Sequence, residues 1–553
     1  MKPDQSLASL GMRPGTSSSN TQLPVLQVRD LSVCLPPGAD RSLAVNRVSF
    51  DIPAGQTLCI VGESGSGKSM IANALMGLLP LPHVRTVGGQ MLFDGEDLRQ
   101  ASEPRLRELR GQRIAMIFQE PMTSLNPVMR VGEQLQEVLD CHCPAMPGAE
   151  KRRKVIDALG DVGLPDPEQI VDSYPFRLSG GQRQRVMIAC AMLLEPTLLI
   201  ADEPTTALDV TTQAQILTLM KTLQQRKGMS LLFITHDFGV VAQIADHVVV
   251  MQTGEVVESG NAQIVLREPK NAYTRKLIDA IPQGIARPPA DADSRPTLLE
   301  VRTLNKTYRS GGGWFKPART VHAVKNLSFT IREGETLGIV GESGSGKSTV
   351  GRCLTGLIPM DSGDIRFDGQ PLAADVRQRK PADRGQLQMV FQDPYASLNP
   401  RHSVGSAIAA GPLAQGVTKT EAWRRTRELL QLVGLKDDAA ERYPHEFSGG
   451  QRQRIAIARA LAVRPRLIVA DEPVSALDVS VQAQVLELFE QVRRDFQLSM
   501  VFITHDLRVA AQMCDHIAVM RRGEVVEYGE TASVLGDPQH DYTRELIAAA
   551  PRF

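Results

Sequence analysis

Residues 62–69 read Gly62-Glu63-Ser64-Gly65-Ser66-Gly67-Lys68-Ser69, and residues 341–348 repeat the same eight letters. Each copy follows a short apolar run that ends at Val61 or Val340. A glycine-rich turn between a strand and a helix, closed by Lys-Ser, is typical of a loop whose backbone N–H groups surround a nucleotide phosphate. The repeat therefore predicts two phosphate-binding sites in one chain.

Three further motifs return at a constant distance. Ser-Gly-Gly-Gln begins at Ser179 and Ser448, and both Ala-Asp-Glu-Pro and Ile-Thr-His-Asp also recur 269 residues on. A repeat of this length indicates two homologous units. We place domain 1 at residues 23–282 and domain 2 at 298–553. A Pro- and Ala-rich linker at 283–297 joins them, and residues 1–22, which lack the apolar core of a signal peptide, are expected to form a disordered tail.

Composition limits the classes of partner. The chain has 553 residues, of which 42% are hydrophobic, and its 62 basic residues balance its 62 acidic ones. This balance gives no electrostatic reason to expect a nucleic acid as a partner. The sequence contains no run of about 20 apolar residues, the length that a helix needs to span a bilayer. The seven cysteines are scattered and odd in number, and Cys141-His142-Cys143 lacks zinc-site spacing, so we expect reduced, structural thiols.

Short apolar runs alternate with helical patterns in both units. The alternation predicts an α/β sheet with crossover helices. The predicted strands are residues 25–33, 57–61, 198–201 and 231–234 in unit one and 299–304, 336–340, 467–470 and 501–503 in unit two; helices are predicted over 213–225 and 482–493. A hairpin and an amphipathic Tyr-Thr-Arg tail close each unit, at Tyr273 and Tyr542.

The phosphate loop assigns roles to its residues. Lys68 and Lys347 are expected to reach the β- and γ-phosphates of ATP, and the hydroxyls of Ser69 and Ser348 to bind Mg²⁺. A turn without a function would not require two identical copies, each after a strand. The remaining candidate phosphate contacts are Gly62, Ser64, Gly65 and Gly67 in unit one and Gly341, Ser343, Gly344 and Gly346 in unit two.

An acidic pair follows an apolar strand in each unit. Asp202 and Asp471 are expected to hold Mg²⁺ beside the phosphate loop, and Glu203 and Glu472 to polarise the attacking water as general bases. Such a pair is otherwise compatible with a simple helix cap. The phosphate loop upstream favours the catalytic interpretation.

A histidine and a glutamine complete the predicted catalytic set. His236 and His505 each stand 33 residues after the glutamate, which favours a γ-phosphate contact over a structural role. Gln119 and Gln392 each end a predicted strand, before a Ser-Leu-Asn-Pro segment. We expect the two glutamines to sense Mg²⁺ and the attacking water, as additional metal ligands.

The Ser-Gly-Gly-Gln loops precede Arg-Gln-Arg and an apolar-periodic helix. The loop offers a hydroxyl and backbone N–H groups to a phosphate, although a serine at this position also caps a helix. The candidate ATP contacts are Ser179, Gly180, Gly181 and Gln182 in unit one and Ser448, Gly449, Gly450 and Gln451 in unit two.

Together these motifs resemble those of the ATP-binding cassette (ABC) ATPases over nearly the whole chain. The resemblance implies two tandem P-loop ATPase domains, each with a RecA-like α/β core, an antiparallel β subdomain and a helical signature subdomain. It also implies a head-to-tail pair in which Ser179 contacts the ATP held by Lys347, and Ser448 the ATP held by Lys68. Asp209 and Asp478 would communicate across the interface.

The match narrows to one group of ABC ATPases. Two motifs resemble those of the dipeptide/oligopeptide/nickel importers: Gly-Glu-Ser-Gly-Ser-Gly-Lys-Ser, which occurs in both units, and Tyr-Pro-His-Glu-Phe-Ser-Gly-Gly-Gln, which occurs in unit two. The resemblance implies an ATPase that energises a bacterial importer of peptides, including glutathione-like substrates. Two transmembrane permease subunits and an extracytoplasmic solute-binding protein would be its partners, and it would lie peripherally on the cytoplasmic face of the inner membrane.

Two other classes of function compete with an importer. A soluble twin-cassette ATPase acting on ribosomes or DNA would share the phosphate and signature loops. Ribosomal relatives join their cassettes by a long charged helix and DNA-repair relatives carry zinc modules; here the linker is short and Pro-rich, and zinc spacing is lacking. A metabolic kinase with a phosphate loop would explain neither the signature loops nor the repeat.

The two units differ where relatives stack an aromatic ring on adenine. Unit two has Tyr308 at this position, whereas unit one has Leu35. Leucine offers apolar contact without a π-face. We therefore expect weaker nucleotide affinity at the Lys68 site.

Overall fold

The computed structural model describes residues 24–119, 124–206, 208–286, 295–310, 319–475 and 477–550. The expected N-terminal tail and the centre of the expected linker lie outside these residues.

Each half contains two sheets with the same strand order. The four-stranded antiparallel sheets are β2-β1-β4-β5 and β12-β11-β14-β15, and the six-stranded sheets are β10-β9-β3-β8-β7-β6 and β20-β19-β13-β18-β17-β16. Topology therefore repeats with the sequence, as expected for two tandem α/β domains that each carry an antiparallel β sheet and a helical subdomain.

The strands have the following bounds. In the first half they are β1 (Leu26–Cys34), β2 (Leu43–Ile52), β3 (Thr57–Val61), β4 (Arg85–Phe93), β5 (Glu96–Asp97), β6 (Ile114–Ile117), β7 (Leu198–Asp202), β8 (Ser230–Thr235), β9 (His247–Gln252) and β10 (Glu255–Asn261). In the second they are β11 (Thr297–Ser310), β12 (Arg319–Arg332), β13 (Thr336–Val340), β14 (Ser362–Phe367), β15 (Gln370–Pro371), β16 (Leu387–Val390), β17 (Leu467–Asp471), β18 (Ser499–Thr504), β19 (His516–Arg521) and β20 (Glu524–Glu530).

The helices repeat in the same way. The first half has α1 (Lys68–Leu75), α2 (Glu103–Leu109), α4 (Val131–His142), α5 (Gly148–Asp161), α6 (Pro167–Ile170), α7 (Gly180–Met192), α8 (Val210–Lys227), α9 (Phe238–Ile244), α10 (Ala262–Arg267) and α11 (Ala272–Asp279). The second has α12 (Lys347–Leu354), α13 (Pro381–Gln386), α14 (Pro394–Ser397), α15 (Val404–Ala414), α16 (Lys419–Leu432), α17 (Gly449–Leu461), α18 (Val479–Phe496), α19 (Leu507–Met513), α20 (Thr531–Gly536) and α21 (Asp541–Ala549).

The six-stranded sheet positions the chemistry. In the first half β6, β7, β8, β3 and β9 are parallel, and every residue of β3 and β7 is buried. Strands buried on both faces read as continuous apolar runs, which is why the sequence located them. Parallel strands end at one edge, so the loops after β3, β6, β7 and β8 meet there.

A separate helical layer carries the signature loops. In the first half α4, α5 and α7 pack against one another, and in the second half α15, α16 and α17 do the same. Leu135, Leu139, Val155 and Val186 lie buried in one cluster with strand residues of the main sheet. The helix α7 is thereby fixed to the core of the main sheet.

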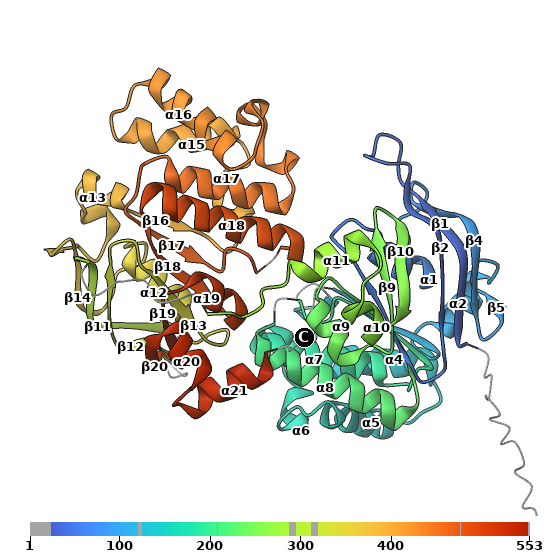
Figure 1. Ribbon diagram of the computed structural model, residues 1–553. Coiled ribbons are helices and arrows are strands. Elements are labelled where there is room, and N and C mark those ends of the chain that lie inside the picture. The colour runs from blue at the N-terminus through green and yellow to red at the C-terminus, as the bar shows by residue number, and fades with distance from the viewer. Residues whose placement is uncertain are drawn as a thin grey trace, which may run out of the picture.

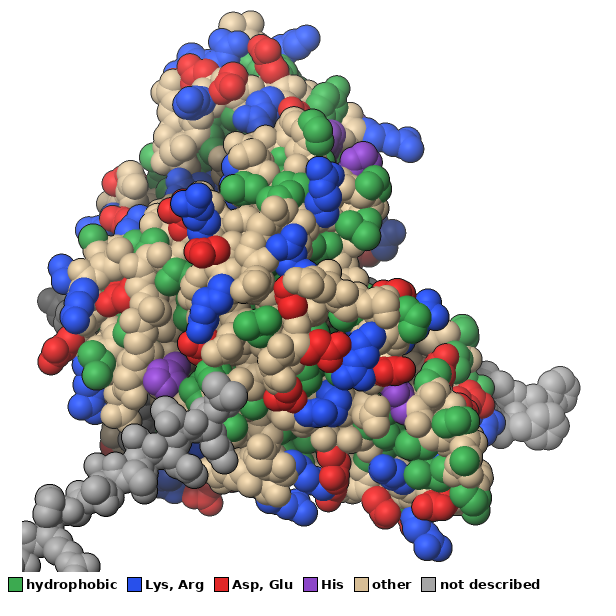
Figure 2. All heavy atoms as spheres, turned by 90° about the vertical axis from the view of Figure 1, so that its right-hand side faces the viewer, with side chains coloured by type: hydrophobic (Ala, Val, Ile, Leu, Met, Phe, Trp, Pro, Cys, Tyr) green, Lys and Arg blue, Asp and Glu red, His purple; other side chains and the backbone are tan. Residues whose placement is uncertain are grey.

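The two halves lie side by side, with α11 of the first beside α18 of the second and α21 of the second beside α8 of the first (Figure 1). Basic and acidic side chains are interspersed on the face seen in Figure 2, as the balanced composition leads one to expect. Within the described residues, every helix is too short or too polar to traverse a bilayer.

Candidate functional site

The first phosphate loop joins β3 to α1. Gly67 caps α1 with a left-handed backbone (φ 102°), and a Cβ there would lie 2.4 Å from the Ala44 carbonyl oxygen. Glycine is therefore required at this position. The Lys68 ammonium donates to the carbonyl oxygens of Gly62 and Glu63 at 2.7 and 2.9 Å.

The second phosphate loop repeats this geometry between β13 and α12. Gly346 has φ 109°, and a Cβ there would meet the Ala323 carbonyl oxygen at 2.1 Å. Lys347 donates to the carbonyl oxygens of Gly341 and Glu342 at 2.6 and 2.8 Å. Burial lowers the pKa of both Lys68 and Lys347, while nearby carboxylates oppose this effect.

The loops also contain hydroxyls suited to a ligand. Ser66 and Ser345 are buried, and their hydroxyls have no hydrogen-bond partner among the described residues. Space around Gly65 and Gly344 is open where a Cβ would stand. A buried unpaired hydroxyl is costly, so the chemistry of both loops fits an anion that accepts hydrogen bonds.

The predicted magnesium ligands are brought together in both halves. The Ser69 hydroxyl donates to Asp202 Oδ1 at 3.0 Å, and the Ser348 hydroxyl to Asp471 Oδ1 at 2.8 Å. Burial raises the pKa of Asp202 to about 6 and also raises that of Asp471. Each site has few protein oxygens, which suits Mg²⁺, because this ion keeps waters and shares phosphate oxygens.

Glu203 lies at the centre of the cluster that is predicted to be catalytic in the first half. Its carboxylate accepts hydrogen bonds from Gln119 Nε2 and Thr206 Oγ1, each at 3.0 Å, and pairs with His236 Nδ1 at 3.3 Å. Its backbone is left-handed (φ 46°), a conformation that L-residues rarely adopt. The structure thus brings together the three residues that the sequence placed in catalysis.

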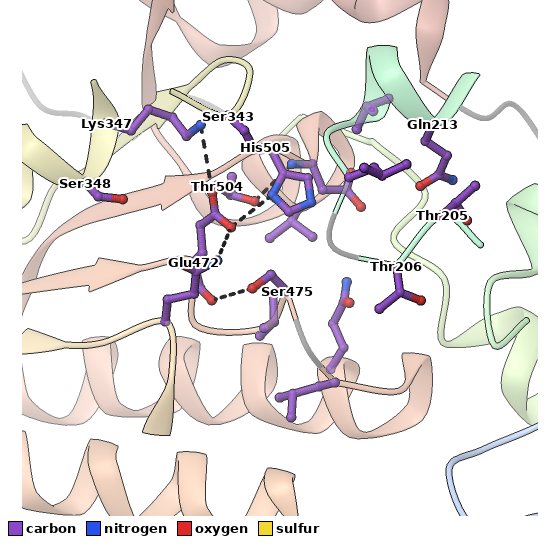
Figure 3. A pocket seen from close by; sticks show the side chains of 18 of the residues that line it. Thr205, Thr206, Gln213, Ser343, Lys347, Ser348, Glu472, Ser475, Thr504 and His505 are labelled. Atoms are coloured by element: carbon purple, nitrogen blue, oxygen red, sulfur yellow. Dashed lines mark hydrogen bonds and ion pairs between the residues drawn. The ribbon is translucent and has the colours of Figure 1, made fainter. Parts of the chain in front are cut away.

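The second cluster repeats the arrangement around Glu472 (Figure 3). Gln392 Nε2 donates to its carboxylate at 3.0 Å, His505 Nδ1 lies 3.2 Å away, and the Lys347 ammonium lies 3.8 Å away. Ser475, which corresponds to Thr206, donates instead to the Glu472 carbonyl oxygen at 3.1 Å.

Both glutamates are held as carboxylates. Burial alone would raise the pKa of Glu203, but the hydrogen bond and charge of His236, aided by Lys68, outweigh burial and lower that pKa to about 2. The pKa of Glu472 is lowered in the same way, by the hydrogen bond and charge of His505 and by the charge of Lys347. Burial lowers the pKa of each histidine, yet the glutamate partner prevails and raises it. A carboxylate is the form that a general base requires.

A cavity of about 1020 Å³ runs between the halves. Glu203 and His236 of the first half line it together with Lys347, Glu472 and His505 of the second. Figure 3 shows Thr205, Thr206 and Gln213 facing this space from the side opposite Lys347. The clusters around Glu203 and Glu472 therefore open toward one shared space.

The halves are joined at both phosphate loops. Asp478 accepts hydrogen bonds from the backbone N–H and the hydroxyl of Ser64, each at 2.9 Å. At the other loop, the Thr211 hydroxyl donates to Glu342 Oε1 at 2.6 Å. Asp209 instead accepts from the Thr212 N–H at 2.9 Å and so caps α8; its Oδ1 lies 2.7 Å from Thr211 Oγ1 and competes with Glu342 for the single proton of that hydroxyl. Each phosphate loop thus faces the start of α8 or α18 from the opposite half.

The signature serines act as helix caps in this structure. Ser179 accepts from the Gln182 N–H at 3.2 Å, while its own N–H donates to the Gln182 side chain; Ser448 and Gln451 form the same capping box. Gly450 lies where a Cβ would come within 2.2 Å of a Val481 methyl group, so α17 packs closely on α18. A contact from either serine to ATP stays a prediction.

Leu35 and Tyr308, the two positions predicted to contact adenine, are structurally equivalent. Leu26 and Leu299 pair with the corresponding residues Phe93 and Phe367 of the neighbouring strands, and Leu35 and Tyr308 each stand nine residues further on. Tyr308 is 38% exposed, whereas Leu35 packs partly buried against the core.

Residues without a predicted role also lie at the interface between the two halves. We call this interface the first seam where it includes the loop of Lys68, and the second seam where it includes the loop of Lys347. The carboxylates of Glu63 and Glu342, within the phosphate loops, accept hydrogen bonds from Ser480 and Thr211 of the opposite half. The repetition of Glu63 and Glu342 in both loops was a usable indication. The identity of their partners was not readable from local patterns.

Comparison with known proteins agrees with this geometry. The family model "ABC transporter" matches residues 45–206 and 324–475, and the model "Oligopeptide/dipeptide transporter, C-terminal region" matches 257–307 and 526–553. The ABC transporter model matches once in each half, which confirms the predicted fold class of two tandem ABC-type ATPase domains; the first match of the oligopeptide/dipeptide model begins at the end of the first half and runs into β11.

Three relatives match almost the whole chain. The peptidoglycan transport ATP-binding protein YejF of Agrobacterium fabrum is 48% identical over 96% of this chain and 97% of its own length. The glutathione import ATP-binding proteins GsiA of Pectobacterium atrosepticum and Escherichia coli O157:H7 are 46% and 45% identical, over 95% of this chain and 89% of theirs. A solved dimeric bacterial ABC transporter cassette is 28% identical over 43% of this chain and 98% of its own, with a TM-score of 0.39.

Proposed function

This chain belongs to the ABC transporter family, and we propose that it is the ATP-hydrolysing subunit that energises an importer of peptide-like solutes. That it is an ATPase follows from the family match in both halves. The observation that carries the substrate class is the oligopeptide/dipeptide C-terminal region, which matches at the end of each half. Relatives named for glutathione import and peptidoglycan transport support a substrate with peptide bonds.

We assign the binding of ATP to the two phosphate loops. Loop N–H groups and the hydroxyls of Ser66 and Ser345 would donate to phosphate oxygens, and Lys68 and Lys347 would leave their carbonyl partners to do the same. Ser179 and Ser448 would approach the nucleotide from the opposite half. The domain bounds, 23–282 and 298–553, follow the same assignment.

Hydrolysis would use Glu203 and Glu472 as general bases. Each holds its charge beside a histidine, which can transfer its hydrogen bond from the carboxylate to the γ-phosphate when ATP is present. Gln119 and Gln392 would orient water next to the carboxylate. Positioning and charge stabilisation supply most of the rate gain in such reactions.

The serine–aspartate pairs fit Mg²⁺. Ser69 with Asp202, and Ser348 with Asp471, would hold the ion, with Gln119 and Gln392 as further ligands. When bound, Mg²⁺ neutralises the charge that develops on the phosphates.

Transport would need partners outside this chain. We propose two permease subunits, an extracytoplasmic solute-binding protein that acts through them, and a peripheral position on the cytoplasmic face of the inner membrane. The alternative of a ribosome- or DNA-directed ATPase is not favoured, because the full-length relatives are named as transport proteins.

Reconstitution tests the proposal. The chain would be co-purified with its cognate permeases, inserted into vesicles and supplied with ATP, solute-binding protein and radiolabelled dipeptide, glutathione or muropeptide. We expect uptake of at least one of these, lost without ATP. ATP turnover that is stimulated by ribosomes or DNA and not by permeases would contradict it.

We predict that Leu35→Tyr tightens nucleotide binding at the Lys68 site. Base–aromatic stacking contributes about 1–3 kcal/mol in nucleic-acid binding, so the gain in affinity should be about fivefold to a hundredfold. Titration of a fluorescent ATP analogue on non-hydrolysing protein should resolve two affinities in the wild type and bring them together in the variant. Leu35→Met is the matched control, and equal affinities in the wild type would contradict the prediction.

A further inference from the structure

The C-terminal helix of each half crosses to the other half. Helix α11 contacts α18, and α21 contacts α8 (Figure 1). Each tail helix therefore lies against the helix of the opposite half that begins directly after Asp209 or Asp478. The tails belong to both seams as well as to their own domains.

At the first seam the tail and the opposite half meet at one carboxylate. The Tyr273 hydroxyl donates to Glu63 Oε2 at 3.1 Å, and the Ser480 hydroxyl donates to Glu63 Oε1. Tyr273 comes from the first half's tail and Ser480 from α18 of the second half. Glu63 is half-buried between them.

The second seam has a related arrangement around Glu342. The Thr211 hydroxyl donates to the Glu342 carboxylate at 2.6 Å. The backbone N–H of Glu342 donates to the Tyr542 hydroxyl at 3.1 Å. Tyr542 is only 2% exposed, with the Arg521 guanidinium 4.6 Å from its ring centroid. The same three positions are thus linked twice, with serine in one seam and threonine in the other.

The glutamates also contact the phosphate-binding lysines. The backbone carbonyl oxygen of Glu63 accepts from Lys68 Nζ at 2.9 Å, and that of Glu342 accepts from Lys347 Nζ at 2.8 Å. One residue is therefore bonded to the lysine through its backbone and to the opposite half through its side chain. A shift of α18 relative to the loop must break the Ser480–Glu63 bond, whereas Tyr273 moves with Glu63.

Charge gives the arrangement a second consequence. A carboxylate in a phosphate-binding loop repels the anion that the loop binds. In the first seam, hydroxyl donors from the tail and the opposite half hold the Glu63 carboxylate toward the seam; in the second seam the Thr211 hydroxyl does this for Glu342. Separation of the halves would release these carboxylates.

We propose that Glu63 and Glu342 are positioning residues that couple the phosphate-binding lysine of each site to closure against the other half, with Tyr273 and Tyr542 as their anchors. This rests on the proposed ATPase function. It gives the C-terminal regions a role at the ATP sites themselves. Binding of ATP at a closed seam would be favoured over binding at an open one.

Ser480→Ala tests the link across the first seam. We expect kcat to fall about five- to tenfold, within the range of measured couplings between sites, while thermal stability is retained. Ser480→Thr supplies the residue that the second seam already uses, and should restore wild-type turnover. A Ser480→Ala enzyme with wild-type kcat would overturn the proposal.

A double-substitution comparison separates coupling from general damage. Glu63→Ala combined with Ser480→Ala should cost little more than Glu63→Ala alone, because both substitutions remove the same hydrogen bond. Glu63→Ala combined with Thr211→Val affects different seams, so the two losses should multiply. Cooperativity between the two ATP sites affects both double variants. Only the difference in non-additivity between the two double variants therefore reports the Ser480–Glu63 contact, and equal non-additivity in both would refute a role for this contact in coupling.

The tail is tested by Tyr273→Phe, since Tyr273 is half-buried and its ring is kept. We expect kcat to fall. The affinity for ATP, measured in non-hydrolysing protein, should change by a smaller factor than kcat. A wild-type protein without ATP turnover would count against the proposed function itself. Wild-type turnover that no seam variant alters would count against the coupling alone.

Discussion

Replacement of both Glu203 and Glu472 by glutamine is expected to reduce ATP turnover by at least about a hundredfold. General-base catalysis contributes roughly 10²–10⁴-fold, and glutamine cannot accept the proton. Each glutamate is held as a carboxylate by its histidine, so the wild-type enzyme has the base in its active form at neutral pH. Phosphate release under saturating ATP measures the effect.

The two single variants give more detail. Glutamine keeps the size of the side chain and retains an acceptor for Gln119 or Gln392, so the fold should be preserved. Each single substitution should lower turnover strongly, because both clusters are complete. A single variant with wild-type turnover would show that its site is not catalytic.

Ser448→Asp is expected to have an effect of similar size on the site held by Lys68. Asp caps a helix about as well as Ser, so α17 should remain folded. Its negative charge would face the phosphates of ATP bound to the opposite half. Loss of one stabilising donor in an active site costs about 10²–10³-fold, and added repulsion makes at least about a hundredfold loss of turnover the expectation.

Ser448→Asn is the control for this variant. Asn also caps helices well and carries no charge, so it should reduce turnover far less than Asp. Thermal unfolding of both variants would verify that capping is equivalent. If Asp and Asn lower turnover equally, Ser448 does not lie near phosphate.

The sheets and loops could be predicted because their determinants are local. Thr57–Val61 and Thr336–Val340 are buried parallel strands with the predicted bounds, because burial on both faces demands continuous apolar residues. The glycines at 67 and 346 were readable because left-handed turns exclude other residues. The predicted helices form parts of α8 and α18, which start three residues earlier, directly after Asp209 and Asp478.

The seam was not predictable in the same way. Ser480 and Glu63 are 417 residues apart, and no periodicity or spacing relates them. Their contact depends on how two folded halves pack. The same holds for Tyr273, which a sequence pattern identifies as part of an amphipathic tail and nothing more. Ser179 was selected as an ATP contact, whereas the structure shows it as the cap of α7, and its contact with a nucleotide stays a prediction.

The seam contacts support head-to-tail pairing, in which each nucleotide is enclosed by both halves. Its most direct test is a structure of the Glu203→Gln, Glu472→Gln protein with ATP and Mg²⁺ trapped. The account predicts ATP on Lys68 in contact with Ser448, and ATP on Lys347 in contact with Ser179. Two trapped ATP molecules, each contacted by residues of its own half alone, would contradict it.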